Sequence, residues 1–134
     1  MRFFFDRNLA FRLARMVDAL EVEHTVRSFD DDDRFNPKTP DIDWIKAIAA
    51  DNPPWVVVSG DGRILRNKTE LSALKEAGLT FFCLSKQWMH MTIYEQAWKL
   101  IKVWPDIVEN AKGTSPRIHE VSGGAGLKIE RLYL

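Results

Sequence analysis

The sequence predicts one α/β domain, a three-layer α/β/α sandwich with a mostly parallel central sheet. Apolar runs suited to buried strands alternate with amphipathic stretches at helical spacing almost throughout the 134 residues. The two clearest strands, residues 3–5 and 55–59, are apolar at successive positions, as expected of strands covered on both faces. The chain is long enough to bury a substantial core, so a single domain suffices.

The net charge of zero predicts no broad affinity of the whole surface for nucleic acid or membranes. Nineteen basic and 19 acidic residues cancel, so binding to nucleic acid or another polyanion must come from a local patch. The single cysteine, Cys83, lies in an apolar run and is expected to be a buried core thiol. The amino terminus lacks the longer apolar region of a signal peptide, and no run could span a bilayer. We therefore expect a cytoplasmic protein with no membrane partner.

The first quarter of the chain predicts a strand, a helix and a second strand. The buried strand at residues 3–5 is followed by a helix over 9–20, for which Asn8 is a suitable N-cap. A short strand follows at 24–28. The acidic run at 30–37 lacks the glycine and the glutamate of a calcium-binding EF-hand loop, so we interpret it as a solvated loop.

The middle of the chain repeats the alternation. A helix begins at Asp41 and ends before the prolines at 53 and 54. The strand at 55–59 is the clearest central strand, and glycines in residues 60–63 break it sharply. Asn67 then begins a helix with Glu70 in the capping-box position.

The last third predicts two more strands and a long helix. Residues 79–84 form another buried strand, and a helix from Thr92 is kinked or restarted at Pro105. Residues 117–121 are expected to be a last, edge strand. We divide the chain into a domain over 1–121 and a glycine-rich joint with a C-terminal tail over 122–134, part of which alternates like a strand.

Acids follow the two most apolar strands. Asp6 comes directly after the first strand, and Asp61 after the strand at 55–59. In a parallel sheet both acids reach the same edge, where they repel each other unless a cation neutralises them. Carboxylate oxygens favour Mg²⁺ or Mn²⁺. The spacing therefore predicts an acidic metal site in which Asp6 and Asp61 are catalytic metal ligands.

A third acid is expected from the helix that begins at the same edge. Its apolar stripe, with roughly 100° between successive residues, centres near the direction of Asp41, whereas Asp43 points nearly opposite. Asp41 is therefore the preferred catalytic metal ligand, with Asp43 in reserve. Ordinary structural roles also fit: Asp41 as a helix N-cap and Asp61 as a turn residue between glycines.

Other chemistries are less well supported. The three histidines are scattered, and no phosphate-binding glycine loop occurs. Glu95 is a weak choice for a fourth acid, because it stands four residues before Lys99 as in an ordinary surface pair. Polar and basic groups that follow the strands could contact substrate phosphate. The candidates are Arg7, Asn8, Arg63, Arg66 and Lys86.

Three segments together resemble PIN-like domains of the VapC45 type. They are residues 4–9, 39–45 and 56–64, which carry the acids in the same order as in that family. Further similarity extends the resemblance over roughly residues 2–121. No single motif is specific, whereas their order and their spread along the chain are.

The resemblance implies a compact α/β nuclease in which clustered acids bind Mg²⁺ or Mn²⁺ and activate water to cut RNA. It implies metal-ligand roles for Asp6, Asp61 and either Asp41 or Asp43. Many such proteins are toxins restrained by an antitoxin protein, and related PIN proteins are often homodimers. The sequence departs from fuller PIN sites at residues 85–87, where no fourth acid stands.

We therefore expect a metal-dependent endoribonuclease that hydrolyses RNA phosphodiester bonds with an acid-bound Mg²⁺, as the toxin of a toxin–antitoxin pair. Two alternatives stay open. One is a PIN-like binding or scaffold module with weak or no nuclease activity. The other is a nuclease that acts outside a toxin system.

Overall fold

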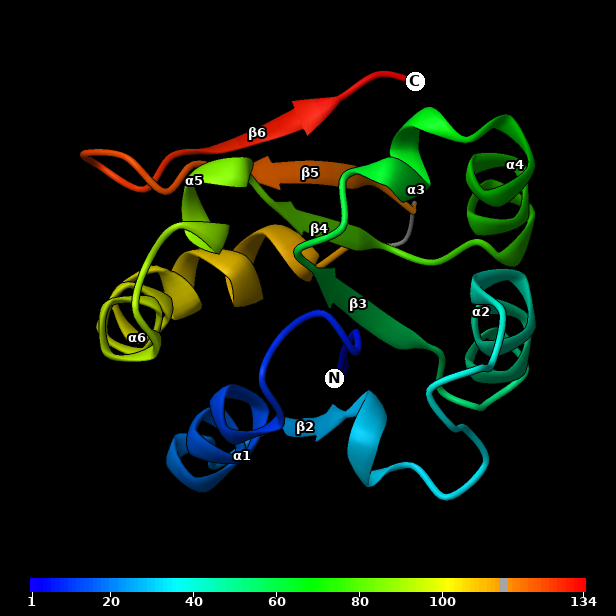
Figure 1. The fold of residues 1–134 in the computed structure, drawn as a ribbon, viewed down its shortest axis with the longest axis horizontal. Coiled ribbons are helices and arrows are strands. Elements are labelled where there is room, and N and C mark those ends of the chain that lie inside the picture. The colour runs from blue at the N-terminus through cyan, green and yellow to red at the C-terminus, as the bar shows by residue number, and fades with distance from the viewer. Residues whose placement is uncertain (114–115) are drawn as a thin grey trace.

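A computed structural model describes residues 1–113 and 116–134. Its centre is a six-stranded sheet in the order β2-β1-β3-β4-β5-β6, parallel except for the antiparallel β6 (Figure 1). The strands are β1 Arg2–Phe5, β2 Thr25–Ser28, β3 Trp55–Ser59, β4 Phe81–Leu84, β5 Ile118–Val121 and β6 Ile129–Leu132. The helices are α1 Phe11–Leu20, α2 Asp41–Ala49, α3 Arg63–Arg66, α4 Lys68–Ala77, α5 Lys86–Met89 and α6 Ile93–Ala111, with a 3₁₀ turn, η1, at Phe29–Asp31.

The helices cover both faces of the sheet, which confirms the predicted sandwich. Helices α1, α5 and α6 lie on one face, and α2, α3 and α4 lie on the other (Figure 1). The phenylalanines of β1 pack into the hydrophobic cores on both faces of the sheet. Phe3 and Phe5 pack into the core beneath α1 and α6, while Phe4 packs against α2 and α4, and all three are fully buried. Strand β1 is therefore the interior strand that the sequence predicts.

The order of the strands reverses at β1. The chain passes from β1 to β2 on one side and then returns to β3 on the other, so β1 and β3 flank the switch point. Their register is level, because Phe5 of β1 stands opposite Val58 of β3. Open α/β sheets bind ligands in the crevice beyond the carboxyl ends of such strands. The fold thus marks the ends of β1 and β3 as the place for a site.

Local signals define the ends of α4 and α6, and the sequence predicts both the Asn67 capping position and the buried cysteine. The Asn67 side chain accepts the backbone N–H of Glu70 at 3.0 Å, and Gly78 ends α4 in the left-handed conformation with φ of 69°. Thr92 caps α6 by accepting the backbone N–H of Glu95. Cys83 is buried, and burial raises the pKa of its thiol to about 12, which confirms a core cysteine.

Two predicted helix N-caps are wrong, although α2 begins at Asp41 as predicted. Helix α1 begins at Phe11 with Ala10 as its N-cap, and the Asn8 side chain instead accepts the backbone N–H of Gly60 at 3.1 Å. The residue therefore ties the turn after β1 to the turn after β3. Helix α2 is preceded by Pro40 as N-cap, so Asp41 is its first helical residue and its side chain makes no capping bond. The side chain is thereby available to other partners.

The C-terminal part also departs from expectation. Helix α6 runs from Ile93 to Ala111 and continues through Pro105 without restarting. Strand β5 is not an edge strand: β6 pairs with it, opposing Ile118 to Leu132. The expected tail strand therefore exists and completes the sheet, while the division at residue 121 stays a prediction.

The acidic loop is held by ion pairs and is not simply solvated. Asp32 is only 5% exposed and pairs with Arg34 at 2.8 Å and with Arg27 at 3.4 Å. Arg34 also bonds Asp51, which ties the loop to the end of α2. The sequence did not predict α3 and α5, because four-residue helices are too short to show helical periodicity. In the part of the chain that the structure describes, no helix is long and apolar enough to cross a membrane.

Candidate functional site

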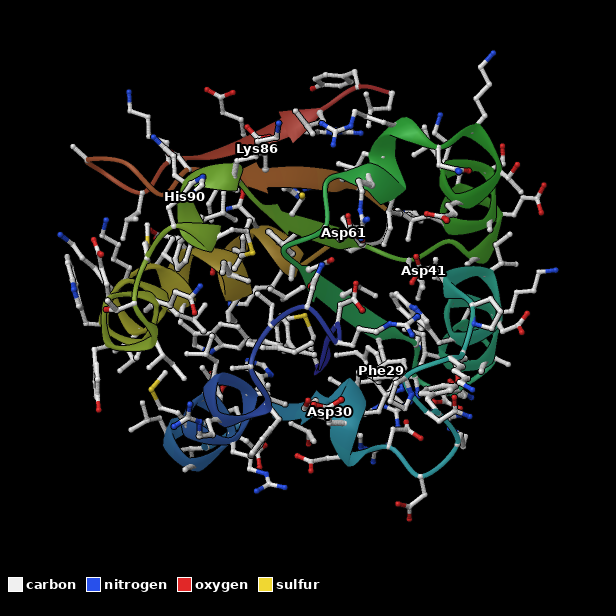
Figure 2. All side chains as sticks on the ribbon, viewed as in Figure 1. Phe29, Asp30, Asp41, Asp61, Lys86 and His90 are labelled. Carbon is white, nitrogen blue, oxygen red and sulfur yellow. The ribbon has the colours of Figure 1, made fainter. Side chains whose placement is uncertain are left out.

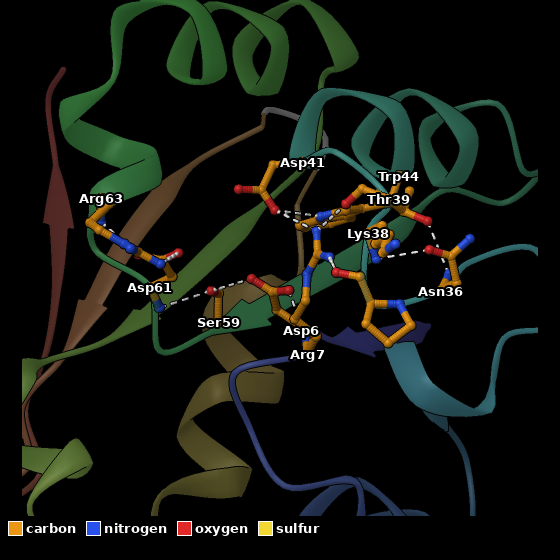
Figure 3. A network of polar contacts seen from close by, with 11 residues as sticks. Asp6, Arg7, Asn36, Lys38, Thr39, Asp41, Trp44, Ser59, Asp61 and Arg63 are labelled. Atoms are coloured by element: carbon orange, nitrogen blue, oxygen red, sulfur yellow. Dashed lines mark hydrogen bonds and ion pairs between the residues drawn. The ribbon is translucent and has the colours of Figure 1, made fainter.

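Asp6 is the buried centre of the carboxyl edge. Its backbone N–H continues the ladder of β1 by donating to the carbonyl of Val58 at 2.9 Å, which fixes where its side chain begins. The residue is only 2% exposed. One carboxylate oxygen accepts the backbone N–H of Arg7 at 2.6 Å, and the other accepts the hydroxyl of Ser59 at 2.8 Å (Figure 3). The carboxylate is thus held rigidly.

Ser59 connects the two strand-end acids. Its hydroxyl oxygen donates to Asp6 and also accepts the backbone N–H of Asp61 at 3.0 Å. The Asp61 carboxylate, 13% exposed, is held by its neighbour Arg63 through contacts of 2.9 and 3.0 Å from the guanidinium. The structure therefore brings Asp6 and Asp61 to one edge, as predicted, and joins them through a single hydroxyl.

Asp41 reaches the same edge from the start of α2. Its carboxylate accepts the guanidinium of Arg7 at 3.0 Å and the indole N–H of Trp44 at 2.8 Å (Figure 3). Arg7 also donates to the carbonyls of Pro37 and Thr39, so it anchors the segment that leads into α2. Since Arg7 follows Asp6 directly in the chain, this arginine links the acid of β1 to the acid of α2.

Asp43 lies apart from this network. It is exposed, and within the described ranges its side chain makes no hydrogen bond or ion pair. The helix geometry that favours Asp41 over Asp43 therefore agrees with where the two side chains lie. The metal-ligand role of either residue stays a prediction.

Burial and neighbouring charge shift the pKa values of Asp6 and Asp61 in opposite directions. Burial raises the pKa of Asp6 to about 6, with a further contribution from the charge of Asp41, while the bonds from Ser59 and Arg7 oppose the rise. The pKa of Asp61 is lowered, chiefly because Arg63 bonds its carboxylate. The edge therefore holds one acid that burial makes reluctant to ionise, Asp6, beside another, Asp61, that an arginine keeps ionised.

Glu70 is a fourth acid that sequence reasoning did not place at this edge. Burial raises the pKa of its partly buried carboxyl, and the charges of Asp41 and Asp61 add to the rise. Only its position in the capping box of α4 was recognised in the sequence, and there its backbone N–H makes the capping bond. The side chain remains free to face the other acids.

The basic and polar residues predicted to contact phosphate divide into two groups. Arg7 and Arg63 neutralise Asp41 and Asp61, while Asn8 bonds the backbone of Gly60. Arg66 and Lys86 line a cleft that begins beside Asp61, and neither side chain has an ion-pair or hydrogen-bond partner among residues 1–113 and 116–134. This second group is therefore available to a ligand.

The acids at this edge offer the type of ligand atom that a hard divalent cation prefers. All the acids offer carboxylate oxygens, and burial raises the pKa of Asp6, so a bound cation would stabilise the charged form that burial disfavours. Their present spacing is wider than an occupied site requires, since the described residues contain no group of three acids, histidines or cysteines that could hold one ion together. Arg7 and Arg63 supply positive charge to two of these acids instead.

Comparison with known proteins agrees with this architecture. The PIN-like domain family matches residues 1–86, which is more than half of the chain and includes β1 to β4 with Asp6, Asp41, Asp61 and Glu70. No curated protein and no solved structure matches the chain. PIN-like domains are commonly nucleases, which points to a nuclease-type function in general. The chain belongs to the PIN-like domain family.

Proposed function

We propose that this protein is a metal-dependent endoribonuclease of the VapC45 type that serves as the toxin of a toxin–antitoxin pair. One observation carries the nuclease proposal. Asp6 and Asp61 end the two strands at the switch point of the sheet and are joined through the hydroxyl of Ser59. Asp41 reaches the same edge through Arg7. Membership of a family that is commonly nucleolytic supports the same conclusion.

Asp6, Asp41 and Asp61 would hold the Mg²⁺ or Mn²⁺ ion. When bound, such an ion supplies an activated water as the nucleophile and neutralises charge that develops on the phosphate. Asp43 is not among the proposed ligands, because it is exposed and lies outside the network. Glu70 would add negative charge beside the site without needing to contact the ion.

The protein's own residues orient this acidic edge. Ser59 fixes the rotamer of Asp6, while Arg7 and Trp44 fix that of Asp41. Arg63 differs from Arg7, since its side chain is 82% exposed and pairs with Asp61 at the surface. Exposed ion pairs contribute little free energy, so Arg63 can leave Asp61 at small cost and contact a substrate phosphate.

RNA cleavage tests the nuclease proposal. Wild type, Asp6→Asn and Asp41→Asn are incubated with single-stranded RNA in Mg²⁺ and in Mn²⁺. Both variants are expected to lose about a hundredfold or more in rate, as for the loss of groups that orient or stabilise the reacting charge. Asp43→Asn is the matched control, because it changes the same residue type two positions along α2 at an exposed site. Equal rates in wild type and Asp6→Asn would contradict the assignment.

The ion pairs of the site favour one alternative function. Because Arg7 and Arg63 already pair with Asp41 and Asp61, the fold is electrostatically satisfied at these acids without a metal. A PIN-like binding or scaffold module with weak or no nuclease activity would need no metal beyond these ion pairs to neutralise its acids. Calorimetric titration with Mn²⁺ separates the two functions, since a nuclease requires binding at millimolar metal or tighter and a scaffold does not.

The toxin role is tested in cells. Induced expression of the wild type is expected to arrest growth, Asp6→Asn is not, and co-expression of a protein encoded beside the chain is expected to relieve the arrest. RNA cleavage in vitro without growth arrest would favour a nuclease that acts outside a toxin system. Sedimentation of the purified chain, alone and with that neighbouring protein, tests both a homodimer and the antitoxin complex.

A further inference from the structure

A cleft of about 480 Å³ extends along the carboxyl edge from the acidic site. Gly60 and Gly62, which flank Asp61 in the chain, line one end, and Lys86 at the start of α5 lines the other. In the view of Figure 2, Asp61 lies between Asp41 and Lys86. The cleft therefore begins where the proposed chemistry takes place and leads away from Asp41.

The surface of the cleft is largely apolar. Its floor is the end of β4, where Cys83 and Leu84 are buried, and its walls come from α3 and from the C-terminal strand. The leucines that line the walls are Leu65, Leu132 and Leu134. A planar, weakly polar group fits such a surface better than a sugar or a phosphate does. The chain after residue 121 thus builds part of the cleft.

Three charged side chains line this apolar space. Arg66 and Lys86 are cations, and Glu120 of β5 is an anion. The Glu120 carboxylate, like the two cations, has no ion-pair or hydrogen-bond partner in the part of the chain that the structure describes. Glu120 and Arg66 both act on the pKa of the Cys83 thiol, as does Asp61, so these charges surround the same floor. A ligand of this cleft should therefore carry a negative charge for the two cations, a planar group for the apolar surface and hydrogen-bond donors for the Glu120 carboxylate.

We propose that this cleft binds a guanine nucleotide of the RNA substrate, adjacent to the phosphate that is cleaved. Arg66 and Lys86 hold the phosphate of that nucleotide, the base packs on the leucine walls, and Glu120 accepts hydrogen bonds from the base edge. The inference rests on the proposed ribonuclease function for its substrate class, and it deepens that function by assigning a base preference.

The carboxylate of Glu120 selects guanine over the other bases. Guanine presents two adjacent donors, N1–H and the N2 amino group, which match the two oxygens of a carboxylate. Adenine and cytosine offer one amino group beside an acceptor, and uracil offers one N–H between two acceptors, so each leaves an acceptor facing the carboxylate. A matched bidentate pair discriminates between bases by about tenfold or more. The polar end of the cleft therefore favours guanine.

Nucleotide binding by NMR tests the inference without requiring catalysis. The full chain, in EDTA, is titrated with each of the four nucleoside 5′-monophosphates, and the backbone amides of Gly62, Leu84 and Lys86 report on the cleft. Guanosine monophosphate is expected to bind about tenfold more tightly than the other three. Glu120→Gln is expected to reduce this difference to within about twofold, because the amide replaces one acceptor oxygen of the carboxylate by an NH₂ donor.

Charge variants separate phosphate binding from base selection. Arg66→Ala and Lys86→Ala are expected to weaken all four nucleotides alike, by about threefold to tenfold each. Lys102→Ala is the matched control, since it removes an exposed lysine from α6, a helix that does not line the cleft, and should leave binding unchanged.

The outcomes distinguish this inference from the proposed function. Equal affinity for the four nucleotides, or no shift of the cleft amides, overturns the guanine cleft whether or not RNA is cleaved. Selective guanosine monophosphate binding that Glu120→Gln abolishes supports the cleft even if the chain cleaves no RNA, and in that case only the nuclease proposal fails. Cleavage without base preference in the binding experiment would leave the nuclease and remove the guanine site.

Discussion

The hydroxyl of Ser59 lies 2.8 Å from a carboxylate oxygen of Asp6, inside a sheet edge where both residues are shielded from water. Two neighbouring strands each contribute one partner, so the bond fixes the acid of β1 against the end of β3. The same hydroxyl accepts the backbone N–H of Asp61. A small change at Ser59 should therefore disturb both strand-end acids without touching either carboxylate.

Ser59→Ala is expected to lower nuclease activity and to shift its pH dependence. The Ser59 bond lowers the pKa of Asp6, which burial has raised to about 6, so its removal should raise that pKa further. Activity that needs ionised Asp6 would then rise at a higher pH than in wild type. The pH–rate profile of RNA cleavage measures this. A uniform loss of rate with an unchanged profile would show that Ser59 acts only through folding.

Asp6→Asn is expected to stabilise the metal-free protein at neutral pH. The folded pKa of about 6 lies above the ordinary 3.8, so the contribution of Asp6 to stability is complete below pH 3.8 and is lost as the pH rises through 6. The loss corresponds to about 3 kcal/mol. Asparagine cannot ionise and avoids it. Urea unfolding in EDTA at several pH values measures the effect, with Asp43→Asn as control, and parallel curves for wild type and Asp6→Asn would refute it.

Arg7→Ala and Arg63→Ala are expected to differ although each removes the partner of an acid. Arg7 is partly buried and bonds Asp41 together with two carbonyls before α2, so its loss should cost about 1 to 3 kcal/mol. Arg63 is exposed, and its loss should cost much less stability than the loss of Arg7. Chemical unfolding compares them. If the nuclease proposal holds, Arg63→Ala should lower RNA cleavage while the fold stays intact.

Much of the fold could be predicted from the sequence because its signals are local. The apolar runs of β1, β3 and β4 mark buried strands without reference to any partner. Helix starts at Asn67 and Thr92 depend on one side chain and one nearby N–H. The alternation of these elements is sufficient to predict a parallel sheet covered by helices on both faces.

The remaining features depend on contacts between distant segments. Asn8 has the chemistry of an N-cap, yet its partner is Gly60, 52 residues away, and no local rule selects that bond. Asp6 and Asp61 could be placed because strand ends converge at one edge. Glu70 and Glu120 could not, since they reach this edge only through the packing of α4 and the pairing of β5.

Glu70→Gln is expected to weaken Mn²⁺ binding by about tenfold, a magnitude typical of groups that surround a metal site without ligating it. The variant removes one negative charge from the neighbourhood of Asp41 and Asp61. The cap of α4 should survive, because the backbone N–H of residue 70 makes the bond to Asn67. Glu76→Gln, an exposed change on the same helix, is the control in calorimetric titration. Equal Mn²⁺ affinities in the two variants would show that the charge of Glu70 does not affect the metal site.

His119 is expected to make the protein less stable in mild acid. Its ring is 2% exposed and stacks on Phe82 with ring centroids 4.6 Å apart, and Nδ1 has no partner in the described part of the chain. Burial lowers the pKa of this histidine, and Arg117 and Arg131 add to the effect. The contribution of neutral His119 to stability is therefore present above the unfolded pKa of about 6.5 and is lost as the pH falls through the lower folded value.

His119→Phe keeps an aromatic stack on Phe82 and removes the titration. The difference in unfolding free energy between variant and wild type should therefore widen in favour of the variant as the pH falls below about 6.5. Asp6 changes stability in the opposite sense over part of this range, so the two effects must be measured as differences from wild type. Urea unfolding at half-unit intervals from pH 4 to 8 makes the measurement. A difference that does not vary with pH would mean that His119 is protonated equally in the folded and unfolded chain.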